Sequence, residues 1–283
     1  MSQPKRILLL DTGNEWGGGT NSMFELLKRI DRKRFAVTCC FYKDYRKGKD
    51  GRLLSEELAD IGIPLIVLPS IKQPLWAKLA KEIGRGLFSW SPRLKKQIVL
   101  GVDVQWRIKP RVVTLRQLLG KNEYDLLYMN NQPASNIEGY LAGEMAGLPV
   151  VQHCRIEPTL HTSEAAVVNR VAKRIICVSQ GVADVLAAQR VAENRLRVVY
   201  NAIDSRPPLP KPIELPASAG DLVIGTVGQL TTRKGVHHLL QAVATLKDEG
   251  FALSCLILGE GPQRAELEST ARRLGINGQV SFL

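Results

Sequence analysis

The amino-acid sequence predicts an α/β protein with two units, each built on a parallel sheet. Short apolar runs such as 7–10 alternate along the chain with longer amphipathic stretches such as 20–30. Such runs suit strands buried on both faces of a parallel sheet, and their regular alternation with helices is typical of doubly wound folds. A stretch with five prolines, 206–220, interrupts the alternation and predicts an interdomain linker.

The first unit, residues 1–205, holds most of the expected elements. Its first strand leads through three consecutive glycines, Gly17 to Gly19, into a helix, and we expect these glycines to form a ligand-binding loop. The loop has neither G-x-G-x-x-G spacing nor a following G-K-[ST], so it is not a dinucleotide fingerprint or a P-loop. Strands are expected at 5–10, 34–41, 63–68, 125–129, 150–151, 174–178 and 196–199, and helices at 20–30, 55–61, 112–119, 135–146 and after Ser179.

The second unit, residues 221–283, repeats the alternation on a smaller scale. We expect strands at 222–227, 252–258 and 279–283, with helices at 236–249 and 263–274. A doubly wound domain of ordinary size needs roughly as much chain again. We therefore expect this unit to be the first half of a domain, in a chain that is truncated at its C-terminus.

The overall composition is that of a globular protein. Of 283 residues, 45% are hydrophobic and 23% charged, which excludes disordered and fibrous classes. The five cysteines form no C-x-x-C pair, so we expect buried reduced thiols and neither a disulfide framework nor a zinc site. The sequence shows no secretion signal and no apolar run of membrane-spanning length. We expect a cytoplasmic protein.

The positive charge is concentrated in one segment. The chain carries a net charge of +12, and residues 71–121 hold twelve cations against Glu82 and Asp103. Apolar residues recur at helical spacing within an insertion at about 72–110, for example Trp76, Leu79 and Ile83. A basic amphipathic helix of this kind predicts peripheral contact of 72–121 with an anionic membrane surface. The alternative is a helical hairpin packed on its own domain; without a stacking platform or motif, we expect no nucleic-acid partner.

Polar residues follow two of the predicted strands. Asn130 and Asn131 come after the strand at 125–129, while His153 and Arg155 come at the end of the strand around 150. The carboxyl ends of parallel strands face the crevice where such sheets bind ligands. We therefore expect a functional site here, although His153 would also suit a satisfied structural imidazole.

The turn at 227–235 joins the first strand of the second unit to its first helix. It carries two adjacent cations, Arg233 and Lys234, followed by Gly235. A glycine-bearing turn before a helix offers backbone N–H groups to an anion. The turn therefore predicts a diphosphate clamp, and the alternative is a solvated basic turn.

Taken in order, these motifs resemble glycosyltransferase family 4, whose members have the GT-B fold. The resemblance covers nearly the whole chain apart from about 72–110. It implies two Rossmann-like doubly wound domains, an acceptor-side domain at 1–205 and an incomplete nucleotide-sugar donor domain at 221–283. The motifs are Gly17–Thr20, Asp125–Asn131, Gln152–Arg155, Val178–Ser179, Asn201–Asp204, Val227–Gly235 and Gly259–Pro262, followed by 279–283.

The resemblance also implies residue roles. His153 would contact the transferred sugar as the catalytic residue, and Asn130 and Asn131 would bind the acceptor. Gln229 stands where the family has an arginine, so it brings no charge, and Arg233 is expected to compensate. The donor-binding residues would be Gly18, Gly19, Arg155, Gly228, Gln229, Arg233, Lys234, Gly235, Gly259 and Glu260.

The implied activity is retaining transfer of a sugar from a nucleotide-diphosphate co-substrate, without a metal or other cofactor. The acceptor would be a glycan or lipid-linked molecule of the cell envelope, reached at the inner face of the membrane. The family's Glu-x7-Glu segment is absent up to Leu283, so we expect impaired turnover. The alternatives are an inactive fragment that binds a lipid or partner, and a sugar-nucleotide epimerase.

Overall fold

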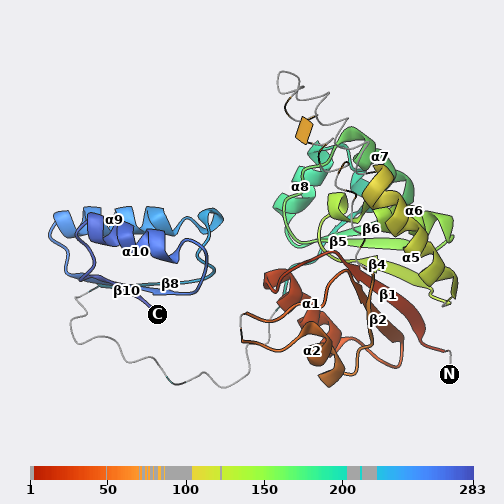
Figure 1. Ribbon diagram of the computed structural model, residues 1–283, viewed down its shortest axis with the longest axis horizontal. Helices are drawn as coiled ribbons and strands as arrows, with labels where there is room; N and C mark the ends of the chain where they lie inside the picture. The colour runs from red at the N-terminus through yellow and green to blue at the C-terminus, as the bar shows by residue number, and fades with distance from the viewer. Residues whose placement is uncertain are drawn as a thin grey trace. The chain divides into compact units, whose positions relative to one another are not determined.

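The chain folds into two compact units, Met1–Ser205 and Arg206–Leu283, in a computed structural model (Figure 1). The structure describes residues 3–48, 50–69, 104–121, 123–202 and 222–283, with Lys211 and seven positions between 71 and 86. The proline-rich linker and most of the basic insertion lie outside the described residues. Each unit is a parallel α/β sheet with helices, which confirms the predicted fold class.

Unit 1 is built on a seven-stranded sheet in the order β3-β2-β1-β4-β5-β6-β7, with every pairing parallel. The order reverses direction between β1 and β4, and such a switch point is where open α/β sheets bind ligands. The strands are β1 (Lys5–Asp11), β2 (Phe35–Phe41), β3 (Leu65–Val67), β4 (Leu126–Met129), β5 (Val150–Cys154), β6 (Ala172–Cys177) and β7 (Leu196–Val198).

Helices cover both faces of this sheet (Figure 1). They are α1 (Gly18–Arg29), α2 (Leu54–Asp60), α5 (Lys109–Lys121), α6 (Ile137–Met145), α7 (Thr162–Val171) and α8 (Gln180–Ala188). A π-helix, η1 (Val104–Ile108), precedes α5, and short 3-10 turns stand at η2 (Pro133–Asn136) and η3 (Glu193–Arg195). Sequence analysis did not identify α7.

The alternation of side chains along β1 divides the core of unit 1 into two clusters. Leu8 and Leu10 pack with residues of α5, α6, α7 and α8, whereas Ile7 and Leu9 pack with residues of α1 and α2. Each of these leucines is at most 2% exposed, and full burial of such a side chain contributes about 1.5–3 kcal/mol. The fully apolar run in the sequence is thus explained by burial on both faces.

Two glycines let α6 approach the sheet closely. A Cβ atom at Gly139 would lie 2.4 Å from Met129 Sδ, and one at Gly143 would lie 2.5 Å from Val150 Cγ2. Larger residues at either position would push the helix away from β4 and β5. The close contact holds the segment after β4 down on the sheet edge where the polar strand ends meet.

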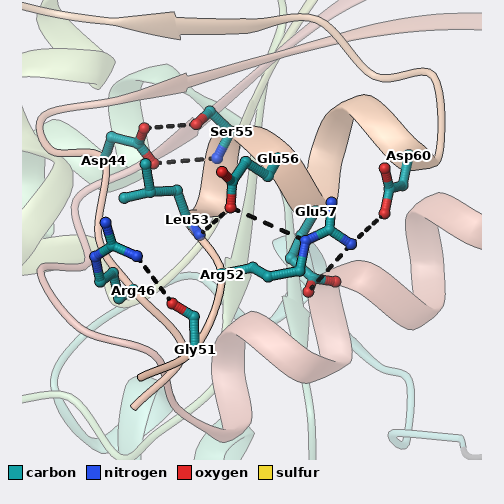
Figure 2. Close-up of polar contacts among 9 residues, drawn as sticks. All are labelled: Asp44, Arg46, Gly51, Arg52, Leu53, Ser55, Glu56, Glu57 and Asp60. Carbon is teal, nitrogen blue, oxygen red and sulfur yellow. Dashed lines mark hydrogen bonds and ion pairs between the residues drawn. The ribbon is translucent and has the colours of Figure 1, made fainter. Parts of the chain in front are cut away.

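The segment between β2 and α2 is held by its own polar contacts (Figure 2). Asp44 accepts hydrogen bonds from the Ser55 backbone N–H at 3.1 Å and from the Ser55 hydroxyl at 2.6 Å, which caps the start of α2. Arg52 reaches along α2 to Glu56, Glu57 and Asp60. These contacts keep the segment beside α1, where the Tyr45 hydroxyl lies 3.2 Å from Thr20 Oγ1.

Unit 2 is a three-stranded parallel sheet in the order β10-β9-β8. Its elements are β8 (Leu222–Val227), η4 (Thr232–Lys234), α9 (Val236–Asp248), β9 (Leu253–Leu258), α10 (Arg264–Arg273) and β10 (Val280–Phe282). Its core joins residues of β9 to α9 and α10. The edge strand β8 is much more exposed, with Val227 at 81%.

The structure describes part of the basic insertion, including exposed apolar residues and Ile108, which is buried. Trp76, Leu79 and Ile83 have 57%, 61% and 50% of their surface exposed, and the Trp76 ring meets Trp106 edge-on at 4.9 Å. Within the described parts of the chain, every helix is too short or too polar to span a bilayer. All five cysteines are buried and free.

Candidate active site

Polar side chains from three neighbouring strands converge at the carboxyl edge of the unit 1 sheet. Asp11 ends β1, Asn130 follows β4, and His153 and Arg155 stand at the end of β5. Asp11, Asn130 and His153 are only 5%, 1% and 8% exposed. Buried polar groups need partners, and here they supply one another.

A chain of hydrogen bonds links Asp11 to Arg155 through Asn130. The Asn130 amide donates to Asp11 Oδ2 at 2.5 Å, and Arg155 Nε donates to Asn130 Oδ1 at 2.6 Å. The Gly13 backbone N–H donates to Asp11 Oδ1 at 2.7 Å. Burial raises the pKa of Asp11, while the bonds from Asn130 and Gly13 and the charge of Arg155 act against that rise. Asp11 therefore orients the Asn130 amide, whose oxygen then orients the guanidinium.

The far end of Arg155 connects the site to α1 and to the end of unit 1. Its Nη1 donates to Ser22 Oγ at 2.5 Å and to Asn201 Oδ1 at 3.3 Å. The Ser22 hydroxyl donates in turn to Asn201 Oδ1 at 2.9 Å. Burial lowers the pKa of Arg155, and the Asp11 charge opposes this shift. The guanidinium is thus half-enclosed with a donor edge pointing towards the start of α1.

The start of α1 offers backbone N–H groups that no side chain caps. The helix begins at Gly18, its N-cap Gly17 provides no side-chain cap, and its first turn has no acidic residue. Such a terminus carries partial positive charge and attracts anions. None of the three glycines has a positive φ. Gly17 and Gly18 instead leave open space at the helix start, since a Cβ atom at either would meet nothing within 4 Å.

Gly19 has a different neighbour. A Cβ atom there would lie 3.5 Å from Arg155 Cδ, an ordinary contact. The guanidinium stem therefore packs on the first turn of α1. The loop and the arginine that were predicted separately from the sequence form one cation-rich corner.

His153 is bonded through one ring nitrogen only. Its Nδ1 lies 2.5 Å from the Tyr128 hydroxyl and 3.3 Å from Arg155 Nη2. Its Nε2 is buried and has no partner among the described residues. Burial, together with the charge of Arg155, lowers the pKa of His153 to about 3, so the imidazole is neutral near pH 7. The expectation of a fully satisfied structural imidazole does not fit this arrangement.

The two predicted acceptor residues lie in different surroundings. The Asn130 side chain is enclosed between Asp11 and Arg155 and faces no solvent. Asn131 is half-buried, has a left-handed backbone with φ of 86°, and its amide reaches Thr12 Oγ1 at 3.4 Å. Asparagine tolerates this conformation better than most residues. Of the pair, Asn131 is the more accessible to a ligand.

Two buried amides that sequence analysis did not select hold this segment. Gln152 donates to the carbonyls of Met129 and Asn131, both at 3.2 Å. Asn136 donates to the carbonyl of Asn130 at 2.7 Å. Both side chains belong to residues that are 0% exposed, and a buried polar residue inside an apolar strand was the available signal for Gln152. Asp11, Ser22, Tyr128 and Asn201 were also missed, because only the fold brings them to Arg155 and His153.

The predicted clamp of unit 2 is an exposed turn. Gln229, Arg233 and Lys234 are all exposed, and no side-chain hydrogen bond or ion pair holds the two cations within the described residues. Gly235 has φ of 68° between η4 and α9, a left-handed conformation that favours glycine. The turn thus has a defined left-handed backbone at Gly235, and its charged side chains are exposed.

A neighbouring loop braces that turn from behind. A Cβ atom at Gly259 would lie 1.9 Å from the carbonyl oxygen of Gly228, and the Leu230 N–H donates to the Glu260 carbonyl at 2.9 Å. The Glu260 carboxylate pairs with Arg264 at 2.6 Å. Gly259 thus permits a close backbone approach, while the Glu260 carboxylate pairs with Arg264 at the start of α10.

The family model for glycosyltransferase family 4 matches residues 16–206, more than half of the chain. The chain belongs to glycosyltransferase family 4. A second model, for glycosyl transferases group 1, matches residues 211–283 of this family 4 chain. The resemblance drawn from the motifs is confirmed.

Named relatives agree with this membership. The family 4 chain is 30% identical over 220 residues to the 2-deoxystreptamine glucosyltransferase of Streptomyces kanamyceticus, which covers 68% of this chain and 56% of the relative. It is 31% identical over 120 residues to the lipopolysaccharide core biosynthesis glycosyltransferase LpsE of Rhizobium meliloti, covering 38% and 31%. The chain therefore spans little more than half the length of the first relative.

Solved structures share the fold. HepE of Anabaena, in complex with UDP and glucose, superposes with a TM-score of 0.66 at 20% identity, covering 99% of this chain and 69% of that chain. At this identity the likeness concerns the fold alone. Among the described residues, no three His, Cys, Asp or Glu side chains gather where they could hold a metal ion; the metal-free reaction stays a prediction.

Proposed function

We propose that this protein transfers a sugar from a nucleotide-diphosphate sugar to a glycan or lipid-linked acceptor, with retention at the anomeric carbon. The observation that carries the proposal is the array of Asp11, Asn130, Arg155 and His153 at the switch point of the unit 1 sheet. It combines a half-enclosed cation with a neutral imidazole, as recognition of a charged diphosphate beside an uncharged sugar requires.

The donor diphosphate is assigned to a cationic corner of unit 2, the turn where Lys234 and Arg233 are exposed and free of partners within the described residues. Unit 1 has a cationic corner of its own that suits an anion, the start of α1 with Arg155. Positive charge beside the diphosphate stabilises the leaving nucleoside diphosphate as the bond from the anomeric carbon to phosphate breaks. Arg233 supplies the charge that Gln229 lacks.

His153 and Asn131 are assigned to the uncharged partners of the reaction. The neutral imidazole suits a hydrogen bond to a sugar hydroxyl, because burial keeps it unprotonated near pH 7. Asn131 is half-buried beside Thr12 and is assigned to the acceptor. The acceptor hydroxyl forms the new bond to the anomeric carbon on the face that the diphosphate leaves, and its proton passes to that leaving group.

A measurement of donor binding and turnover tests this function. UDP- and GDP-sugars are screened with the chain for thermal stabilisation and for release of nucleoside diphosphate. Lys234→Ala and Arg155→Ala are compared with Arg273→Ala, which removes an exposed cation of α10. We expect the first two to weaken donor binding and the control to leave it unchanged; equal affinities for all would refute both corners.

The same assay separates the alternatives. Free epimer formed without an acceptor would indicate an epimerase, and binding without any sugar release would indicate an inactive fragment. Transfer to an added acceptor, with retention read from the anomeric proton coupling of the product, would support the proposal. The family membership of the chain favours transfer.

The acceptor is proposed to lie at the inner face of a membrane. Trp76, Leu79 and Ile83 expose apolar surface in the segment that carries most of the net positive charge, and one relative is named for lipopolysaccharide core synthesis. Basic segments with exposed apolar residues bind anionic bilayers. Co-sedimentation with anionic and neutral vesicles at low salt tests this, and Trp76→Ser with Leu79→Ser should reduce binding. No pelleting with anionic vesicles would remove the membrane from the proposal.

A further inference from the structure

The two nitrogens of His153 are in opposite situations. Nδ1 lies within hydrogen-bond distance of two groups, the Tyr128 hydroxyl at 2.5 Å and Arg155 Nη2 at 3.3 Å. Nε2 is enclosed and has no partner among the described residues. The Tyr128 and His153 rings meet edge-on, at 89° and 6.1 Å between centroids. The Tyr128 hydroxyl therefore points at the edge of the imidazole that carries Nδ1.

These contacts determine which nitrogen carries the proton of the neutral ring. A guanidinium nitrogen can only donate, so a proton on Nδ1 would face another proton from Arg155. It would also deprive the Tyr128 O–H of its acceptor, because no other hydrogen bond of that hydroxyl is found among the described residues. Nδ1 must therefore accept, and the proton of the neutral imidazole resides on Nε2. The hydrogen bond made by one nitrogen of a histidine commonly selects the tautomer in this way.

We infer that Tyr128 is a positioning residue that holds His153 as its Nε2–H tautomer, so that the imidazole presents one N–H donor to a ligand hydroxyl oxygen. Tyr128 reaches the site only through His153 and contacts no reacting atom itself. Tyr128 lies within β4 among apolar residues. The polar residues at the end of this strand therefore do not predict its role. The role of the tautomer in sugar transfer rests on the proposed function, whereas the tautomer itself does not.

The role of His153 Nε2 as a hydrogen-bond donor also follows because the other states of the ring are excluded. Nδ1 is engaged, and the ring stays neutral because burial and the Arg155 charge both oppose protonation and lower its pKa. Asp11 is the carboxylate in this network, and its partners are Asn130 and Gly13. An orphaned buried donor is costly unless something accepts from it. Because Nε2 is buried, an oxygen that accepts from it must displace a neighbouring group.

Proton–nitrogen correlation spectra of the histidine rings test the inference in the complete chain without any sugar. The chain has four histidines, and the signals of His153 are assigned from their loss in His153→Gln. In the wild type we expect a single tautomer, with the proton on Nε2, from pH 5 to about 8. In Tyr128→Phe we expect both tautomers in comparable amounts. A wild-type ring with its proton on Nδ1, or in exchange between the two, would overturn the inference.

A matched variant distinguishes the effect of losing the Tyr128 hydroxyl from the effect of losing another buried hydroxyl nearby. Tyr140 is fully buried, and its hydroxyl donates to Gln152 Oε1 at 3.1 Å. Gln152 precedes His153 in the sequence, but the Tyr140 hydroxyl does not contact the His153 ring. Tyr140→Phe should leave the His153 tautomer unchanged. If Tyr128→Phe also leaves it unchanged while the protein stays folded, Tyr128 has no positioning role. Should Tyr128→Phe not fold, the wild-type spectrum still decides the tautomer, and Arg155→Lys tests the second contact.

Kinetics then connect the tautomer to transfer. Loss of about half of the donor tautomer should lower kcat/KM for the sugar donor about twofold, in proportion to the fraction of the competent tautomer that remains. Affinity for the nucleoside diphosphate alone should not change, because His153 is assigned to the sugar. A tautomer shift without a kinetic effect would mean that the positioning is real but that His153 does not contact the sugar, which distinguishes failure of the assignment from failure of the inference.

Discussion

The charged residues of unit 1 and those of unit 2 are presented in opposite ways. Arg155 is held by Asn130, Ser22 and Asn201 in a largely buried network, whereas Arg233 and Lys234 stand exposed and unpartnered among the described residues. Under the proposed function, the two arrangements would prepare for an anion in different ways. Unit 1 would have its geometry set before an anion binds, whereas the exposed cations of unit 2 would be ordered by the anion itself.

The largest effect is expected from breaking the network of unit 1 at its centre. Asn130→Ala removes the amide that joins Asp11 to Arg155 and leaves a buried carboxylate without its side-chain donor. Loss of one partner from a buried charged network costs about 3–5 kcal/mol. All four tryptophans lie in unit 1, so tryptophan fluorescence during denaturation reports the free energy of unfolding of this unit.

Asn201→Ala is the matched control, because Asn201 is exposed and contributes a longer bond to the same arginine at 3.3 Å. We expect it to change the free energy of unfolding by less than about 1 kcal/mol. Equal effects of the two alanines would mean that the network does not stabilise unit 1 more than a surface contact does.

The second prediction concerns acid. The pKa of His153 is lowered to about 3 in the folded chain, whereas the unfolded residue titrates near 6.5. Between these values the unfolded state binds a proton that the folded state does not, so stability falls as pH decreases from about 6.5. The slope is about 1.4 kcal/mol for each pH unit. Fluorescence-monitored unfolding from pH 7 to 4.5 should show this loss in the wild type and less of it in His153→Gln; parallel curves would contradict it.

The third prediction sharpens the comparison by testing the frame of the unit 2 turn. Gly259→Ala forces a side chain into the carbonyl of Gly228 at a φ of 153°, and strained backbone of this kind costs about 1–3 kcal/mol. Gly228→Ala is the control, because a Cβ atom there meets nothing within 4 Å. Hydrogen exchange of the β9 amides should accelerate in the first variant and stay unchanged in the second. Equal exchange would mean that the two loops separate without cost.

The smallest effect on stability, and the most specific effect on binding, is expected at the exposed cations. Lys234→Ala should leave the unfolding of both units unchanged, because the side chain has no partner to lose among the described residues. It should nevertheless weaken binding of a nucleoside diphosphate about tenfold, as expected for one charged hydrogen bond. Titration calorimetry measures this against Arg273→Ala. A loss of stability together with unchanged affinity would reverse the comparison between the units.

Much of the fold could be predicted because burial leaves a regular trace in the sequence. The apolar run of β1 and the regular alternation of strands with helices predicted a parallel sheet, and the family is confirmed. Helix starts were less accurate: α1 begins at Gly18, so two glycines expected in a loop belong to the helix. Because glycine has no apolar side chain, the hydrophobic periodicity does not reveal that a glycine belongs to the helix.

The network around the site was harder to predict, because its members are joined by tertiary contacts. Ser22 and Asn201 form a hydrogen bond although they are 179 residues apart in the sequence. Tyr128 lies in an apolar strand, where a site residue is not expected. Asn130, assigned to the acceptor from the sequence, lies between Asp11 and Arg155, and its acceptor role stays a prediction. Sequence spacing indicates which strand ends meet, but the direction of each side chain depends on partners that are distant in sequence.

The bond between Arg155 and Asn201 makes the end of the described range 123–202 part of the network around the site. Asn201 and Ser22 both accept hydrogen bonds from Arg155 Nη1. An anion that binds this nitrogen would compete with Asn201 for it. By reciprocity, a change that draws Asn201 away from Arg155 would raise the affinity of this nitrogen for the anion by the same factor.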